Sequence, residues 1–169
     1  IAYSFSRTFG VIYNLLTDTI VNSWHSNNTF WPNSSHFLPH AMDISSTDYA
    51  VVAGFTKESA IGSYRLVIHL LRVSNTTAHV VDTWAYPLAN ASSRNWDAES
   101  FHSKYIMSVS INDAASHVLV GVPSMNTVFR FEVNVTSDRL SYMSSLSNGN
   151  YLGLGKSVAW LDDGEAMVI

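Results

Sequence analysis

The hydrophobic positions of this chain fall in short runs separated by polar turns, and this pattern predicts β-strands. The runs are rich in Tyr, Phe, Trp, Val, Ile and Thr, the residues that favour a pleated sheet. No stretch of three turns that is free of β-branched clusters carries apolar residues at the spacing of an amphipathic helix. We predict twelve strands, over residues 9–16, 19–24, 41–45, 49–55, 64–73, 78–85, 105–111, 117–122, 127–133, 140–146, 157–161 and 166–169. The predicted fold class is therefore all-β.

The predicted strands recur in units of two kinds. One unit is an apolar strand, a polar turn and a strand that carries a hydroxyl and usually an aromatic residue. The other is an alternating strand, a tight acidic turn and a continuous apolar strand, with Val52, Leu119 and Val168 at equivalent positions. Together they give half a unit, two four-stranded units and another half, over residues 1–24, 41–85, 105–146 and 157–169.

Four antiparallel strands per unit are typical of a β-propeller blade. We therefore predict one domain over residues 1–169, a partial β-propeller of about three blades. A propeller needs at least four blades to close, so the domain is expected to be an excerpt of a larger one. An all-β sandwich of about twelve short strands is the alternative.

Two short motifs connect the repeat to a known family. Residues 154–159 read LGKSVA, and residues 120–123 read VGVP and are followed by TVFRF at 127–131. These segments resemble the FG-GAP repeats that form the blades of integrin-α-type propellers, and residues 52–55 (VAGF) are a looser copy. The resemblance covers residues 105–169 and, more loosely, 41–73. It implies a propeller used for binding or as a structural module at a cell surface or outside the cell.

The chain departs from that family where many of its blades bind calcium. The corresponding turns, at residues 45–48, 112–116 and 162–165, lack the alternating carboxylates that would surround a cation needing six or more oxygens. Asp162, Asp163 and Glu165 come nearest, and an acidic hairpin accounts for them. His36 and His40 have a ligand-like separation, but Pro39 lies between them and no helix is predicted there. We predict no metal and no cofactor.

Composition narrows the possible partners. Hydrophobic residues make up 47% of the chain and charged residues only 13%, with a formal net charge of −4. This balance argues against nucleic acid or an anionic membrane as a partner. No apolar run approaches the ~20 residues of a membrane span, so no membrane insertion by this segment is expected.

Five glycosylation sequons favour the secretory pathway. They begin at Asn27, Asn33, Asn75, Asn90 and Asn134, all in or beside predicted loops. The chain has no cysteine, which also fits the cytosol, so a cytosolic scaffold with accidental sequons remains an alternative. The predicted location is extracellular or at the cell surface.

The long connections carry aromatic residues that could meet a partner. Trp31, Phe37, Trp96 and Phe101 are expected to gather on one face, where a protein or carbohydrate ligand would use them. The competing interpretation is that they fold back over the blade edges. We identify no catalytic residue, because the carboxylates are scattered and no Gly-x-Ser-x-Gly elbow occurs. The predicted function is a non-catalytic binding or structural module, and a propeller-fold enzyme such as a glycan-processing hydrolase is the alternative.

Overall fold

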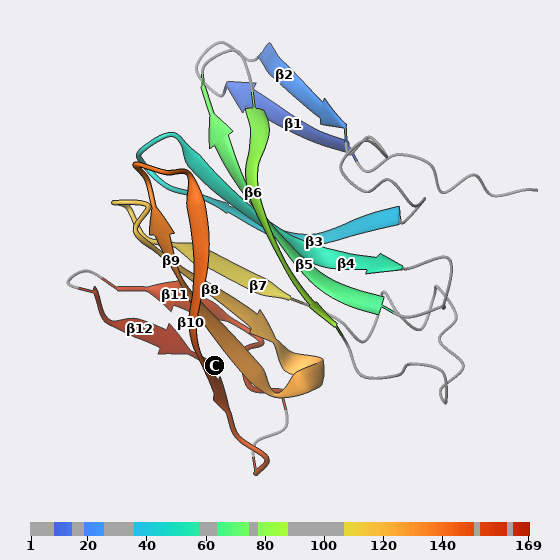
Figure 1. Cartoon of the computed structure of the whole chain (residues 1–169), viewed down its shortest axis with the longest axis vertical. Coiled ribbons are helices and arrows are strands. Elements are labelled where there is room, and N and C mark those ends of the chain that lie inside the picture. The colour runs from blue at the N-terminus through green and yellow to red at the C-terminus, as the bar shows by residue number, and fades with distance from the viewer. Residues whose placement is uncertain are drawn as a thin grey trace, which may run out of the picture.

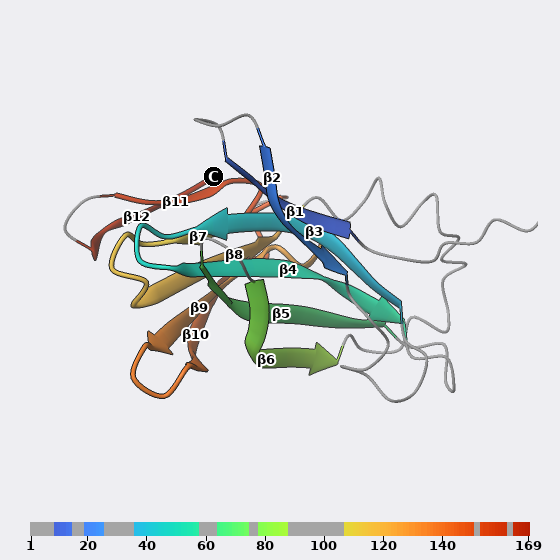
Figure 2. The same ribbon diagram turned by 90° about the horizontal axis from the view of Figure 1, so that it is seen from above.

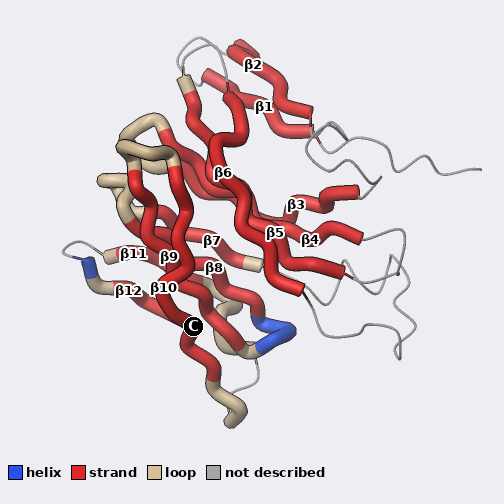
Figure 3. Tube along the Cα trace, viewed as in Figure 1, coloured by secondary structure: helices blue, strands red, loops and turns tan. Residues whose placement is uncertain are grey.

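The computed structural model describes residues 9–14, 19–25, 36–57, 64–74, 78–87, 107–150, 153–161 and 164–169. For β1 and β2 only the backbone is described. Twelve strands and one short 3₁₀ helix make up this part of the chain (Figures 1 and 3). The elements are β1 (Phe9–Asn14), β2 (Thr19–His25), β3 (His36–Ile44), β4 (Tyr49–Lys57), β5 (Tyr64–Val73), β6 (Ala78–Pro87), β7 (Ser108–Ile111), β8 (His117–Val122), η3 (Pro123–Met125), β9 (Thr127–Asn134), β10 (Arg139–Ser147), β11 (Val158–Trp160) and β12 (Ala166–Val168).

The strands form four antiparallel sheets that follow the order of the chain. We call β1–β2 the N-terminal hairpin, β3–β4–β5–β6 the first full sheet, β7–β8–β9–β10 the second full sheet, and β11–β12 the C-terminal hairpin. Within each full sheet, every strand pairs with the next one along the chain. The all-β class is therefore confirmed, and the two full sheets are antiparallel and four-stranded.

The strands form where the hydrophobic pattern places them. In β9, Phe129, Phe131 and Val133 are buried, while Arg130 and Glu132 between them are exposed. This alternation is typical of a strand with one covered face. In β8 the continuous run Val118–Val122 is buried on both faces, as expected for a strand inside a stack of sheets.

The first full sheet packs against the second, and the second packs against the C-terminal hairpin (Figure 2). The largest buried cluster lies between the two full sheets and includes Val51, Ala53, Phe55, Leu66, Ile68, Leu70, Val118, Val120, Val122, Phe129, Phe131 and Val133. Burying each of the larger side chains contributes about 1.5–3 kcal/mol. A second cluster covers the opposite face of the first full sheet, and a third joins the second full sheet to the C-terminal hairpin.

The first strands of successive sheets are linked by the same polar contact twice. Asp43 Oδ2 on β3 accepts a hydrogen bond from Ile111 N on β7 at 2.9 Å. Ser110 Oγ on β7 accepts one from Trp160 N on β11 at 3.3 Å. Ser110 is the acceptor at the second of these contacts, and Ile111 is the residue that follows it. The side chain of Asp43 therefore binds the backbone N–H one residue beyond the next acceptor in the series. The step from sheet to sheet is therefore repeated, in hydrogen bonding as well as in packing.

Two glycines let the second full sheet and the chain before β11 come close together. A Cβ on Gly121 would lie 2.1 Å from the Gly155 carbonyl oxygen, and Ser108 Oγ donates to that same oxygen at 2.8 Å. Gly155 itself has a φ of +89°, which favours glycine. These are the glycines of the VGVP and LGKSVA motifs, so the two motifs meet in space.

The prediction for the start of the first full sheet was wrong. β3 begins at His36, although we expected a loop as far as His40 because proline removes a donor from the sheet. Pro39 is tolerated because β3 is an edge strand and the pairing shifts between Pro39 and Ala41. Phe37, predicted to be an exposed loop aromatic, consequently lies in β3 and is only 5% exposed.

Candidate functional site

The structure describes only part of the predicted set of functional residues. Trp31, Trp96 and Phe101 lie outside the described residues, as do the sequons at Asn27, Asn33, Asn75 and Asn90. Phe37 packs edge-on against His69, with ring centroids 4.6 Å apart, so it offers no surface to a partner. Asn134 is exposed at the β9–β10 turn, where its Oδ1 accepts hydrogen bonds from the N–H groups of Thr136 and Ser137. A glycan at Asn134 would point into solvent.

An aromatic patch lies between the outer strands of the two full sheets. In β6, Trp84 and Tyr86 are two positions apart and lie on the same face of the strand. Tyr142 of β10 reaches them from the other sheet, since the Trp84 and Tyr142 rings stack 5.9 Å apart. We define the aromatic patch as Trp84, Tyr86 and Tyr142. Sequence analysis missed all three residues, although an aromatic in the fourth strand was one of the marks of the repeat.

The three rings are almost parallel. Trp84 stacks on Tyr86 with centroids 5.8 Å apart and planes 16° apart, and the planes of Trp84 and Tyr142 differ by 13°. At such distances the rings are offset, so each ring leaves part of its face uncovered. Tyr86 and Tyr142 are 40% and 47% exposed, whereas Trp84 is half-buried. The patch is therefore a set of nearly parallel aromatic rings, two of which are exposed to solvent.

Core residues hold the aromatic patch from below. Phe131 packs edge-on against Trp84 at 4.9 Å, and Phe129 lies 5.7 Å from both Trp84 and Tyr86. Both phenylalanines are buried in the core between the full sheets. Tyr142 Oη donates to Ser145 Oγ at 3.2 Å, which orients its ring. The patch is consequently a fixed surface with few rotamers to lose on binding.

Two carboxylates of the described residues, Asp43 and Asp82, are hydrogen-bonded to backbone. Asp82, on the same strand as Trp84, accepts from Leu140 N through Oδ2 at 2.8 Å and lies 3.6 Å from the guanidinium of Arg139. Asp43 accepts from Ile44 N and Ile111 N. Both therefore tie sheets together. Among the residues that the structure describes, no group of three His, Cys, Asp or Glu side chains could hold a metal ion.

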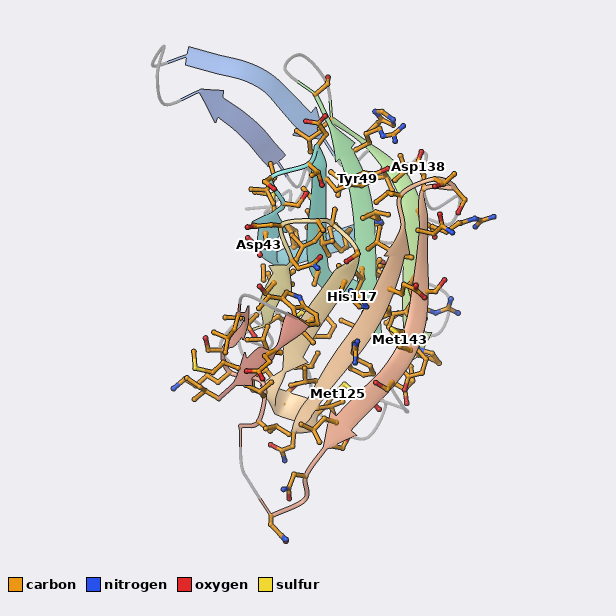
Figure 4. All side chains as sticks on the ribbon, turned by 90° about the vertical axis from the view of Figure 1, so that its left-hand side faces the viewer. Asp43, Tyr49, His117, Met125, Asp138 and Met143 are labelled. Atoms are coloured by element: carbon orange, nitrogen blue, oxygen red, sulfur yellow. The ribbon has the colours of Figure 1, made fainter. Side chains whose placement is uncertain are left out.

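A second polar cluster joins the first full sheet to the β9–β10 turn. The Tyr49 hydroxyl contacts the Asp138 carboxylate, lies 3.1 Å from the Val135 carbonyl oxygen and accepts a hydrogen bond from Arg72 Nη2 at 2.8 Å (Figure 4). Arg72 also pairs with Asp138 at 3.3 Å. Burial and the hydrogen bond to Asp138 raise the pKa of Tyr49. Arg72 and Tyr49 belong to the same sheet, but their contacts with Val135 and Asp138 cross between sheets, so the cluster is a structural tie.

One histidine is buried in the first full sheet. His69 is 3% exposed, and its Nδ1 lies 2.8 Å from Thr83 Oγ1 on the neighbouring strand. Burial lowers the pKa of His69 to about 4, so the ring is neutral at physiological pH. Across the β5–β6 hairpin, His69 is paired with Thr83, and His79 is paired with Arg72.

No protein-family model matches the chain, and no curated protein matches it. Within the described part of the chain, no helix is long and apolar enough to span a bilayer.

Proposed function

We propose that this chain is a non-catalytic binding module built from the blades of a β-propeller, used outside the cell or at its surface. Two observations support the propeller. Each full sheet is a simple antiparallel meander, and the step between sheets repeats with the same polar contact. The resemblance of residues 105–169 to FG-GAP repeats points to the same arrangement. The turns at residues 45–48, 112–116 and 162–165 favour a version that does not bind calcium, because they lack alternating carboxylates.

The aromatic patch is the observation that carries the binding role. Tyr86 and Tyr142 expose 40% and 47% of their surface, although buried phenylalanines hold the rings in fixed positions. Rigid aromatic faces bind ligands at a small entropic cost and are enriched in binding hot spots. Their negative ring faces suit the C–H face of a sugar, so we propose a glycan as the ligand, with an apolar segment of a protein as the second candidate.

Binding to arrays of cell-surface oligosaccharides and of extracellular proteins tests this proposal. Tyr86→Ala and Tyr142→Ala are expected to weaken binding about tenfold each, which corresponds to about 1.4 kcal/mol. Met143→Ala is the matched control, because Met143 lies on the same strand as Tyr142 and is 46% exposed, yet it is not part of the aromatic patch (Figure 4). Binding that survives both tyrosine substitutions would refute the role of the patch.

Expression through a eukaryotic secretory pathway tests the proposed location. Treatment with a glycosidase should increase the electrophoretic mobility of the secreted protein. Asn134→Gln should remove one glycan, because Asn134 is an exposed sequon at a turn. Unchanged mobility of the wild-type protein would contradict the extracellular assignment.

A further inference from the structure

The link between β10 and β11 contains the one Asn-Gly pair of the sequence, Asn148-Gly149. An asparagine side chain that is followed by glycine can react with its own main chain, because glycine has no Cβ to obstruct the nitrogen of the peptide between them. Gly149 is exposed, and a Cβ built on it would have no neighbour within 4 Å in the described part of the chain. The peptide after Asn148 is therefore open to water and to base.

The side chain of Asn148 is folded towards this peptide. Its Oδ1 accepts a hydrogen bond from Asn150 N at 2.9 Å, which closes an Asx turn around Gly149. Oδ1 reaches Asn150 N only when the carboxamide folds over the following residues, so Cγ of Asn148 is held near the Gly149 nitrogen. The Asn150 N–H also points at the oxygen on which negative charge develops when Cγ is attacked, and a donor placed there stabilises that charge.

Asn134 has the same kind of turn but a different following residue. Its Oδ1 accepts hydrogen bonds from the N–H groups of Thr136 and Ser137 at 3.0 and 3.1 Å. The residue after Asn134 is Val135, whose branched Cβ shields the peptide nitrogen. The molecule therefore contains its own comparison, in which the carboxamide is held in the same way but its reaction with the main chain is obstructed.

The side chains of Asn112 and Asn126 are held away from the peptides that follow them. Asn112 Oδ1 accepts from the N–H groups of Ser116 and His117, on the far side of the β7–β8 turn. Asn126 Oδ1 accepts from Gly153 N at 2.6 Å, across the link between β10 and β11. The folded chain therefore favours the reaction at Asn148 over these two positions.

We infer that Asn148 is a site of spontaneous succinimide formation, and that the fold promotes this reaction. The Gly149 nitrogen loses its proton to hydroxide or to another base and forms a bond to Cγ of Asn148. The bond between Cγ and Nδ2 breaks, and Nδ2 takes up a proton from solvent and leaves as ammonia. Water then opens the cyclic imide. Attack at Cγ restores the main chain and gives aspartate, whereas attack at the main-chain carbonyl gives isoaspartate, whose main chain runs through Cβ and Cγ.

The surroundings make position 148 sensitive to isoaspartate. Asn148 N donates to Asn126 O at 3.4 Å, and Gly153 N donates to Asn126 Oδ1, so one residue holds both ends of the segment between them. Isoaspartate adds one carbon atom to the main chain inside this segment. The segment leads directly into Gly155, which packs against Gly121, so the lengthened chain loosens this contact between the link and the second full sheet.

Peptide mapping of the purified protein by liquid chromatography and mass spectrometry tests the inference. Protein made without glycosylation is incubated at neutral and at mildly alkaline pH, beside a synthetic peptide of residues 145–151. Asn148 should convert to a mixture of aspartate and isoaspartate, faster in the folded protein than in the peptide. The rate should rise with pH, because the Gly149 nitrogen must lose a proton, and Asn134 should remain intact.

Exchanging the following residue gives two matched variants. Gly149→Ala has open space in the fold and should slow the conversion of Asn148 about tenfold, because the new Cβ obstructs the nitrogen. Val135→Gly should make Asn134 reactive, since its turn already holds the carboxamide. Conversion of Asn148 that is no faster in the protein than in the peptide would overturn the inference. So would aspartate formed without isoaspartate, or an Asn134 that stays intact in Val135→Gly.

Urea unfolding tests the effect of the modification on the fold. The modified protein carries an added negative charge, so ion exchange separates it from the unmodified protein. It should unfold at a lower urea concentration than Asn148→Asp, which carries the same charge without the lengthened main chain and should unfold close to the wild type. Equal midpoints for the modified protein and Asn148→Asp would overturn the predicted loosening of the link.

Discussion

Acid should destabilise this fold through the buried imidazole of His69. Its ring lies in the first full sheet, edge-on to Phe37 and within hydrogen-bond distance of Thr83 Oγ1. Burial lowers the pKa of His69 from 6.5 to about 4. The unfolded chain therefore binds a proton between these two pH values that the folded chain does not.

The sign and size of the effect follow from these two pKa values. Because the pKa of His69 is lower in the folded chain than in the unfolded chain, protonation of His69 favours unfolding. The free energy of unfolding is therefore unaffected by His69 above pH 6.5, and it falls as the pH drops towards 4. Linkage gives a loss of about 2 kcal/mol at pH 5 and about 3 kcal/mol at pH 4. A loss of this size is a large fraction of the 5–15 kcal/mol typical of a folded domain.

Urea unfolding at pH 8, 6, 5 and 4, followed by tryptophan fluorescence, measures this loss. His69→Gln is the reference variant, since glutamine can still bond to Thr83 but does not titrate. The other titrating groups are common to both proteins, so they cancel in the difference between the two unfolding free energies. That difference should change by about 3 kcal/mol in favour of His69→Gln between pH 8 and pH 4. A difference that is independent of pH, or an NMR titration of His69 near pH 6.5 in the folded protein, would refute the reasoning.

Three further substitutions test the contacts between sheets by urea unfolding. Gly121→Ala should cost at least about 2 kcal/mol, because its Cβ would meet a backbone oxygen, whereas Gly149→Ala has open space around it and should stay within about 0.5 kcal/mol. Equal effects of these two changes would contradict the close contact. Asp43→Ala should cost about 2 kcal/mol, since it removes a charged acceptor for two backbone N–H groups, and an unchanged midpoint would show that this contact does not contribute. Tyr49→Phe should cost about 1 kcal/mol, and that cost should be smaller in a background of Asp138→Ala if the two groups act together.

Most of the fold could be predicted because each strand carries its own local signal. All twelve predicted strands are present, and the grouping into sheets follows because sequential strands joined by tight turns pair with each other. The missed start of β3 has a tertiary cause. Pro39 is excluded from a central strand, but whether a strand lies at an edge depends on the assembled sheet.

The aromatic patch could not be predicted because it joins residues from different sheets. Trp84 and Tyr142 are both visible as aromatic positions in fourth strands, but they meet only because the outer strands of two sheets lie side by side. The sequence instead favoured the aromatics of the long connections as exposed residues, and Phe37 shows why composition alone misleads there. An aromatic residue next to a turn is as easily the first buried residue of a strand as an exposed anchor.

The predicted alignment of the repeated units was wrong by one residue, because it too depends on how the sheets pack together. The sequence aligned Val52 with Leu119, but Val52 faces away from the second full sheet, whereas Leu119 faces onward to the C-terminal hairpin. The β7–β8 turn spans residues 112–116 and is one residue longer than the β3–β4 turn at 45–48, so Val51 is the true counterpart of Leu119. Because side chains alternate between faces, a slip of one residue exchanges the surface that packs on the previous sheet for the one that packs on the next. The hydrophobic pattern alone does not detect this slip, since both faces of a strand within the stack are apolar. The contacts of Asp43 with Ile111 and of Ser110 with Trp160 reveal the slip of one residue. These polar contacts therefore fix the register of the repeat.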